Sequence, residues 1–187
     1  MMQELSMNVL DVAQNSVAAG AKLIEISLEI DTPERRLLIV IADDGCGIDS
    51  EMLKTVTDPF TTSRKTRRVG LGLPFLKEAA ESTGGALSIT SSPGVGTKVE
   101  ALFTLGHIDL MPIGDIAGTI TTLVQFTPGT DFIFTARADE SSFTVDTREL
   151  RELLGPDVGF DVPEVARWLN EYLQENTAEF LKRSIII

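Results

Sequence analysis

The sequence predicts an α/β (α+β) two-layer sandwich, in which helices cover one face of a mixed β-sheet. Three observations predict this fold. Residues 3–19 repeat apolar side chains at helical spacing, residues 23–30 alternate apolar with polar side chains, and residues 37–42 form a short unbroken apolar run. An apolar helix stripe and the apolar face of a sheet bury each other, and the result is two layers.

The first 106 residues supply the elements of this sandwich in order. Gly20 suits the left-handed conformation that ends a helix, so the first helix ends there. Strands are expected over residues 23–30 and 37–42, with a turn between them, and a short helix is expected over residues 50–55. A further helix over residues 70–83 accommodates Pro74 in its first turn, and two strands over residues 86–91 and 97–105 follow.

The pattern changes after Gly106, which divides the chain into a first domain, residues 1–106, and a C-terminal extension, residues 107–187. Strands over residues 119–126, 132–138 and 143–145 are expected to form a β-meander. Asp146 and Asp161 each precede a glutamate by three positions, which is typical of a helix start. The extension is therefore expected to be a small α+β unit with two helices.

Composition limits the classes of partner. The chain carries a net charge of −12, which argues against a general nucleic-acid or anionic-membrane surface. The single cysteine, Cys46, cannot form an internal disulfide, and no apolar run approaches the length of a membrane span. We therefore expect a cytoplasmic protein that binds no nucleic acid and does not insert into membranes.

Four short motifs, at residues 11–15, 43–47, 70–73 and 94–97, together indicate a nucleotide pocket. Asp11 and Asn15 are four residues apart, so a helix places them on one face. Gly70 opens a helix, whose first N–H groups and positive dipole end suit phosphate. A P-loop sequence and a complete dinucleotide fingerprint are both missing, so the pocket is of another type.

These motifs, in this order, resemble the GHKL superfamily of ATPases, which have the Bergerat fold. The resemblance covers about residues 3–105 and is closest to the ATPase domain of histidine kinases, here in a stand-alone form. It implies that ATP lies across the α/β sandwich, that a lid covers it, and that Mg²⁺ joins the phosphates to an asparagine on the first helix.

By this resemblance, Asn15 is the magnesium ligand and Asp11 occupies the position of the general base. The family usually has glutamate at the general-base position. Because aspartate is about one methylene shorter, we expect hydrolysis to be slow or absent even where ATP is bound. Glu4 and Asn8 have the same spacing and supply a glutamate. We favour Asp11 and Asn15 because residues 16–21 follow Asn15 as the family's first motif requires.

The resemblance also assigns the adenine end of the pocket. Asp43 is expected to accept a hydrogen bond from the exocyclic amine of adenine, at the end of a buried strand. Gly45 and Gly47 let the backbone pass close beneath the base. Thr97 is expected to support Asp43 through its hydroxyl, directly or through water.

The lid and the glycine turn complete the predicted nucleotide contacts. In the family the segment before the glycine turn is the ATP lid, and it carries candidate contacts to the terminal phosphate. The predicted contacts in this region are Thr61, Thr62, Ser63, Lys65, Gly70, Leu71, Gly72 and Leu73.

The function implied is phosphotransfer from Mg-ATP to a separate protein, with a serine, threonine or histidine acceptor. A complete pocket without an internal phosphoacceptor motivates this hypothesis. Two alternatives stay open, a nucleotide-dependent binding module with little turnover and a simple ATPase. The extension is open to several roles, among them contact with a protein partner and formation of a homodimer.

Overall fold

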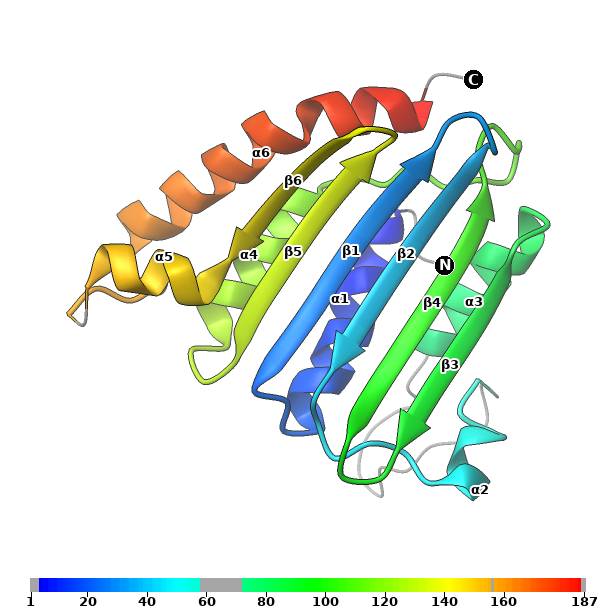
Figure 1. Cartoon of the computed structure of the whole chain (residues 1–187), viewed down its shortest axis with the longest axis horizontal. Coiled ribbons are helices and arrows are strands. Elements are labelled where there is room, and N and C mark those ends of the chain that lie inside the picture. Colours follow the sequence, from blue (N-terminus) through cyan, green and yellow to red (C-terminus); the bar gives the residue numbers. More distant parts are fainter. Residues whose placement is uncertain (1–3, 58–71, 156, 186–187) are drawn as a thin grey trace.

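A single mixed sheet of six strands organises the molecule (Figure 1). The computed structural model describes residues 4–57, 72–155 and 157–185. The strand order is β3-β4-β2-β1-β5-β6. The strands are β1 (Leu23–Asp31), β2 (Arg36–Asp43), β3 (Ala86–Ser92), β4 (Gly96–Thr104), β5 (Asp131–Ala138) and β6 (Ser141–Asp146).

Helices cover one face of this sheet, as Figure 1 shows with α1, α3 and α4 behind the strands. Helix α1 packs against α3 on one side and α4 on the other, and α6 packs against α4. The helices are α1 (Leu5–Ala18), α2 (Ser50–Leu53), α3 (Gly72–Ser82), α4 (Ile116–Phe126), α5 (Thr147–Leu154) and α6 (Pro163–Ile185). The predicted two-layer α+β fold is confirmed.

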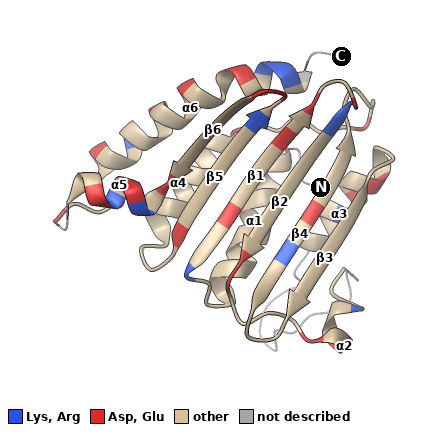
Figure 2. Cartoon of the chain, in the orientation of Figure 1, with Lys and Arg blue, Asp and Glu red and all other residues tan. Residues whose placement is uncertain are grey.

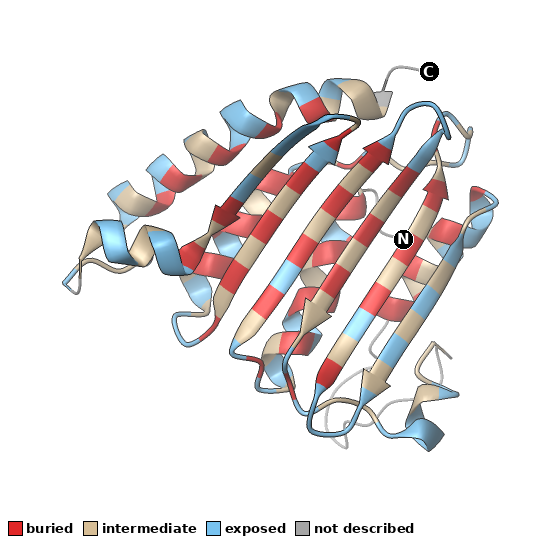
Figure 3. Cartoon of the chain, viewed as in Figure 1, coloured by how far each residue is buried: buried red, intermediate tan, exposed pale blue. Residues whose placement is uncertain are grey.

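The core lies between the helices and the sheet, and strand alternation produces it. Ile24, Ile26 and Leu28 of β1 are almost fully buried, whereas Glu25 and Glu29 point to the opposite face. Buried and less buried residues alternate in the same way along the neighbouring strands (Figure 3). The period-two pattern in the sequence thus marks the face that helix α1 covers.

The exposed face of the sheet carries charges of both signs, as does the surface of α5 (Figure 2). Lys98 and Glu100 of β4 form an ion pair at 2.7 Å, and Arg137 of β5 lies 3.9 Å from Glu29 of β1. Pairs as exposed as these contribute little stability. Within the part of the chain that the structure describes, no helix combines the length and apolar character needed to cross a membrane.

One predicted strand is wrong, because residues 119–126 belong to helix α4. The β-branched residues there favoured a strand, but Asp115 caps a helix by accepting a hydrogen bond from the N–H of Gly118 at 2.8 Å. Ile116, Ile120 and Leu123 then form a buried stripe at helical spacing. Burial against α1 and α6 outweighs the weak intrinsic preference for strand. The expected meander is therefore one hairpin, β5–β6.

The C-terminal residues extend the same sheet. Strand β5 pairs in parallel with β1, with Ile26 opposite Phe134, and β6 pairs antiparallel with β5. The two predicted helix starts are confirmed. Asp146 caps α5 by accepting from the N–H of Arg148, and α6 begins at Pro163.

Candidate functional site

Helix α1 carries two polar side chains at the middle of the site, Asp11 and Asn15. Asp11 is half-buried and lies against the start of α3, whereas Asn15, one helical turn further along α1, is exposed. Burial raises the pKa of the Asp11 carboxyl above its usual value. A carboxylate with a raised pKa, beside an accessible amide, is a suitable arrangement for a base next to a cation site.

The start of helix α3 lies directly against Asp11, and only glycine fits there. A Cβ atom on Gly72 would be 2.9 Å from the Cβ of Asp11, which is closer than side chains approach. Leu73 follows and belongs to the buried hydrophobic core. The first N–H groups of α3, which have no partner within the helix, therefore begin next to the carboxylate of Asp11.

Asp43 stands at the end of β2, and two donors fix its carboxylate. The hydroxyl of Ser16 donates to Oδ2 at 2.5 Å, and the N–H of Gly45 donates to Oδ1 at 2.9 Å. Ser16 belongs to α1 and directly follows Asn15. The sequence did not predict this contact, because Ser16 was interpreted only as one position in the helical repeat of residues 3–19. A polar residue at a buried stripe position was the available signal.

Glycines let the chain after Asp43 fold tightly around it. A Cβ on Gly45 would be 2.9 Å from Oδ1 of Asp43 and 3.0 Å from the Cβ of Ala19. Gly47 has a φ of 69°, and a Cβ there would be 2.0 Å from the carbonyl oxygen of Ser92. The backbone thus passes closely between α1 and β3, as expected for a segment beneath a flat base.

Thr97 lies opposite Asp43 in the β2–β4 pairing, but its hydroxyl contacts a different residue. Its Oγ1 is 2.9 Å from the Oγ of Ser91. The Ser91 hydroxyl also accepts from the N–H of Ile48 at 2.8 Å and donates to the carbonyl of Gly96 at 2.9 Å. Among the described residues, the direct hydroxyl partner of Asp43 is therefore Ser16.

The alternative pair, Glu4 and Asn8, is arranged differently. The side chain of Glu4 accepts from the N–H of Asp115 at 3.3 Å, at the start of α4. Asn8 is completely buried. Neither residue is placed to meet a ligand beside Gly72, so the geometry favours Asp11 and Asn15.

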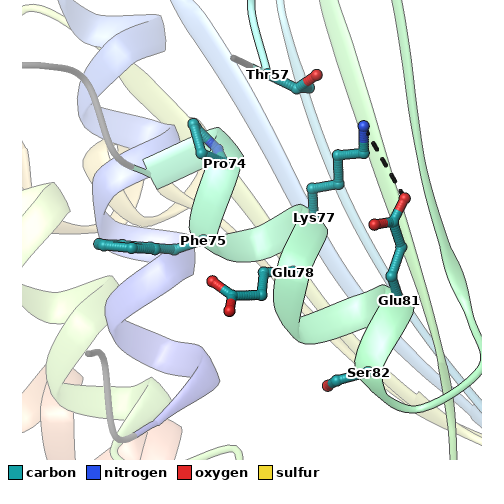
Figure 4. Close-up of a pocket in the computed structure, with 7 residues that line it drawn as sticks. All are labelled: Thr57, Pro74, Phe75, Lys77, Glu78, Glu81 and Ser82. Carbon is teal, nitrogen blue, oxygen red and sulfur yellow. Dashed lines mark ion pairs between the residues drawn. The ribbon is translucent and has the colours of Figure 1, made fainter. Parts of the chain in front are cut away.

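A hollow of about 380 Å³ is lined mainly by residues of α3 (Figure 4). Lys77 and Glu81, one turn apart on α3, form an ion pair there, with Nζ 4.0 Å from Oε1. Its lining residues are Thr57, Pro74, Phe75, Lys77, Glu78, Glu81 and Ser82, and none of them is a predicted nucleotide contact.

Eight of the predicted site residues lie within the described part of the chain. These are Asp11, Asn15, Asp43, Gly45, Gly47, Gly72, Leu73 and Thr97. The remaining predicted contacts, Thr61, Thr62, Ser63, Lys65, Gly70 and Leu71, lie outside the described residues.

Comparison with known proteins identifies a family model and several relatives that match this chain. The family model described as "Histidine kinase-, DNA gyrase B-, and HSP90-like ATPase" matches residues 1–107. Sensor histidine kinase YxdK of Bacillus subtilis is 35% identical over 97 residues, covering 49% of this chain and 30% of that protein. DNA mismatch repair protein MutL of Halobacterium salinarum is 32% identical over 132 residues, covering 64% of this chain and 20% of that protein.

A solved structure agrees in fold. The N-terminal domain of a DNA repair protein superposes with a TM-score of 0.58 at 15% identity, covering 86% of this chain and 55% of the other. The chain spans less than a third of the length of either curated relative. Because a family model matches more than half of the chain, the chain belongs to the histidine kinase-, DNA gyrase B-, and HSP90-like ATPase family, and this membership supports ATP binding.

Proposed function

We propose that this chain transfers a phosphoryl group from Mg-ATP to a separate protein, with Asp11 as the general base. The observation that carries the proposal is the contact between Asp11 and Gly72. It puts a half-buried carboxylate of raised pKa at the N-terminal end of α3, where phosphate binding is favourable. The similarity to sensor histidine kinase YxdK adds support for kinase-type chemistry.

In this reaction the terminal phosphorus of ATP bonds to an oxygen or nitrogen of the acceptor. The bond to the bridging oxygen breaks, and ADP leaves. A serine or threonine acceptor would give its proton to the Asp11 carboxylate, which would also orient the hydroxyl. A histidine acceptor would attack through a ring nitrogen and make less use of a base.

Magnesium fits the residues present. Asn15 offers an exposed amide oxygen, which suits a hard cation, and it lies one helical turn after Asp11, against which Gly72 packs. Among the described residues, no three His, Cys, Asp or Glu side chains are close enough to form a metal site by themselves. We therefore expect the nucleotide phosphates and water to supply most ligands, and the ion to neutralise charge on the phosphates.

The adenine end is proposed to be held by Asp43, whose carboxylate would accept from the 6-amino group. Gly45 and Gly47 would carry the backbone beneath the ring. The lid contacts proposed from the sequence, Thr61, Thr62, Ser63 and Lys65, would meet the terminal phosphate. Thr97 would contribute through water, since its hydroxyl is engaged with Ser91.

The second candidate is a nucleotide-dependent binding module with little turnover. The observation that favours it is the identity of residue 11, where aspartate is one methylene shorter than the usual glutamate. In this case ATP would order the pocket and present the acidic C-terminal surface to a partner. The third candidate is a simple ATPase. The partner of the C-terminal surface could also be a second copy of the chain, which would give a homodimer.

Incubation with γ-labelled ATP, Mg²⁺ and a lysate of the source organism tests the proposal. We expect a labelled partner protein with the wild type and none with Asp11→Asn, which should still bind ATP. Steady phosphate release without a labelled protein would overturn phosphotransfer in favour of an ATPase. ATP binding without release or transfer, with a partner retained only when ATP is present, would favour the binding module.

A further inference from the structure

Ser16 is a buried polar residue whose contact the proposed reaction does not use. Its side chain is only 4% exposed, and its hydroxyl donates to Asp43 Oδ2 at 2.5 Å. The contact joins helix α1 to the end of strand β2, two elements separated by the whole of β1 in sequence. A short hydrogen bond to a carboxylate is among the stronger contacts that a hydroxyl makes.

The family resemblance predicts that Thr97 supports Asp43, but the hydroxyl of Thr97 contacts a different residue. It meets Ser91 at 2.9 Å, and Ser91 holds the N–H of Ile48 at 2.8 Å. Thr97 therefore acts on the turn that follows Gly47. Its effect on Asp43 has to pass through the backbone pairing of β2 with β4 or through water.

We infer that Ser16 is the positioning residue that sets the adenine selectivity of this site, in place of Thr97. With Gly45 donating to Oδ1 and Ser16 donating to Oδ2, both oxygens of Asp43 are fixed in place as acceptors. The lone pairs that remain can accept from a 6-amino group and repel a 6-oxo group. The inference rests on ATP binding by this family and is independent of phosphotransfer.

The selectivity can be measured as the ratio of the affinities for Mg-ATP and Mg-ITP, because inosine carries oxygen in place of the 6-amino group. Titration calorimetry on the full chain gives both values. For Ser16→Ala we expect ATP affinity to fall about tenfold, a typical loss for a hydrogen bond to a charged group. ITP affinity should change much less, so the ratio should fall almost as far.

Ser6→Ala is the matched control. Ser6 lies on the same helix, is 2% exposed, and also donates to a carboxylate, Glu4 Oε2, at 3.3 Å. It is far from Asp43 along α1, so both affinities should stay within about twofold of wild type. Thr97→Val tests the competing assignment and should lower the ratio less than Ser16→Ala does.

Three results would overturn the inference. If Thr97→Val lowered the ratio of ATP to ITP affinity more than Ser16→Ala did, Thr97 would be the residue that positions Asp43. If Ser16→Ala lost ATP and ITP affinity equally, Ser16 would contribute to packing and not to adenine selectivity. If the wild type bound ATP and ITP equally well, both the inference and the proposed contact between Asp43 and the 6-amino group of adenine would be wrong. An absence of phosphotransfer would not bear on any of these measurements.

Discussion

Asp43 is the residue whose replacement should affect nucleotide binding most. In Asp43→Asn the side chain keeps its size, but an amide replaces one of the two fixed acceptor oxygens. The amide nitrogen would face the hydroxyl of Ser16, the N–H of Gly45, or the amine of adenine. We expect ATP affinity to fall by about a hundredfold or more, the effect of losing a charge-assisted contact and leaving donors unpaired.

Calorimetry on this variant, together with far-UV circular dichroism, is the check. The fold should survive because Asp43 is at the end of its strand and outside the apolar core. An ATP affinity equal to that of wild type would show that the adenine subsite has been assigned to the wrong residue.

Replacing Asp11 should abolish phosphotransfer but stabilise the fold at neutral pH. Burial raises its pKa above 3.8, so the folded chain binds this proton more tightly than the unfolded chain does. The stability associated with Asp11 is therefore present below that pH and is lost as pH rises through the folded pKa. At neutral pH the ionised carboxylate destabilises the fold, and an uncharged amide of the same shape does not.

We therefore expect Asp11→Asn to raise the Tm at neutral pH and to leave it close to wild type below about pH 3, where both side chains are uncharged. Differential scanning calorimetry at the two pH values measures this difference. A lower Tm at neutral pH would mean that the Asp11 carboxylate makes a stabilising contact in the folded chain.

The side-chain partner of Asp43 marks the limit of what the sequence could predict at the residue scale. The positions of Asp11, Asn15 and Asp43 follow from helix spacing and from the end of an apolar run. The partner of Asp43 does not follow, because Ser16 and Thr97 both carry hydroxyls and only the packing of α1 against β2 decides between them.

The junction of helices α1 and α3 gives a test at the level of elements. Gly72→Ala would add a methyl group 2.9 Å from the Cβ of Asp11, so the start of α3 would have to move away from α1. We expect ATP affinity to fall about tenfold or more, because the end of α3 that we propose to bind phosphate would shift relative to Asn15. Alanine favours helix over glycine, so propensity alone would predict a gain in stability.

Gly129→Ala is the control for this change. A Cβ on Gly129 has open space around it, and the residue lies in a turn before β5. ATP affinity should match wild type in this variant. Unchanged affinity in Gly72→Ala as well would show that the close approach of α3 to Asp11 is not needed for binding. Calorimetric titration of both variants provides the comparison.

Helix α4 shows why some elements could not be predicted. Before β4, helices α1 and α3 have a helical period, β1 has a period of two and β2 is an unbroken apolar run, and these signals predicted the four elements. Residues 119–126 contain several β-branched side chains, and their helical period is visible only when Ile116 and Asp115 are included. The parallel pairing of β5 with β1 was also unpredictable, because it depends on where α4 returns the chain.

At the scale of the whole molecule, the family region and the C-terminal residues share one sheet and one core. Phe132 and Phe134 of β5 are 1% exposed, and Ile116 and Ile120 of α4 are buried against α1. A chain that ends at residue 107 would lose all four side chains and leave β1 as an open edge. Residues 1–107 match the family model, yet they contain only four of the six strands.

We therefore predict that a fragment of residues 1–107 will not unfold cooperatively. Burial of two phenylalanine and two isoleucine side chains contributes roughly 6 to 12 kcal/mol, which is comparable to the entire stability of an ordinary domain. Thermal denaturation followed by circular dichroism should show a broad transition for the fragment and a sharp one for the full chain. Phe134→Ala in the full chain, at a cost of about 3 to 5 kcal/mol, should lower Tm while keeping the transition sharp. A fragment with a sharp transition near the wild-type Tm would mean that β1 to β4 and their helices form an independent unit, and that β5, β6 and α4 to α6 are a separable addition.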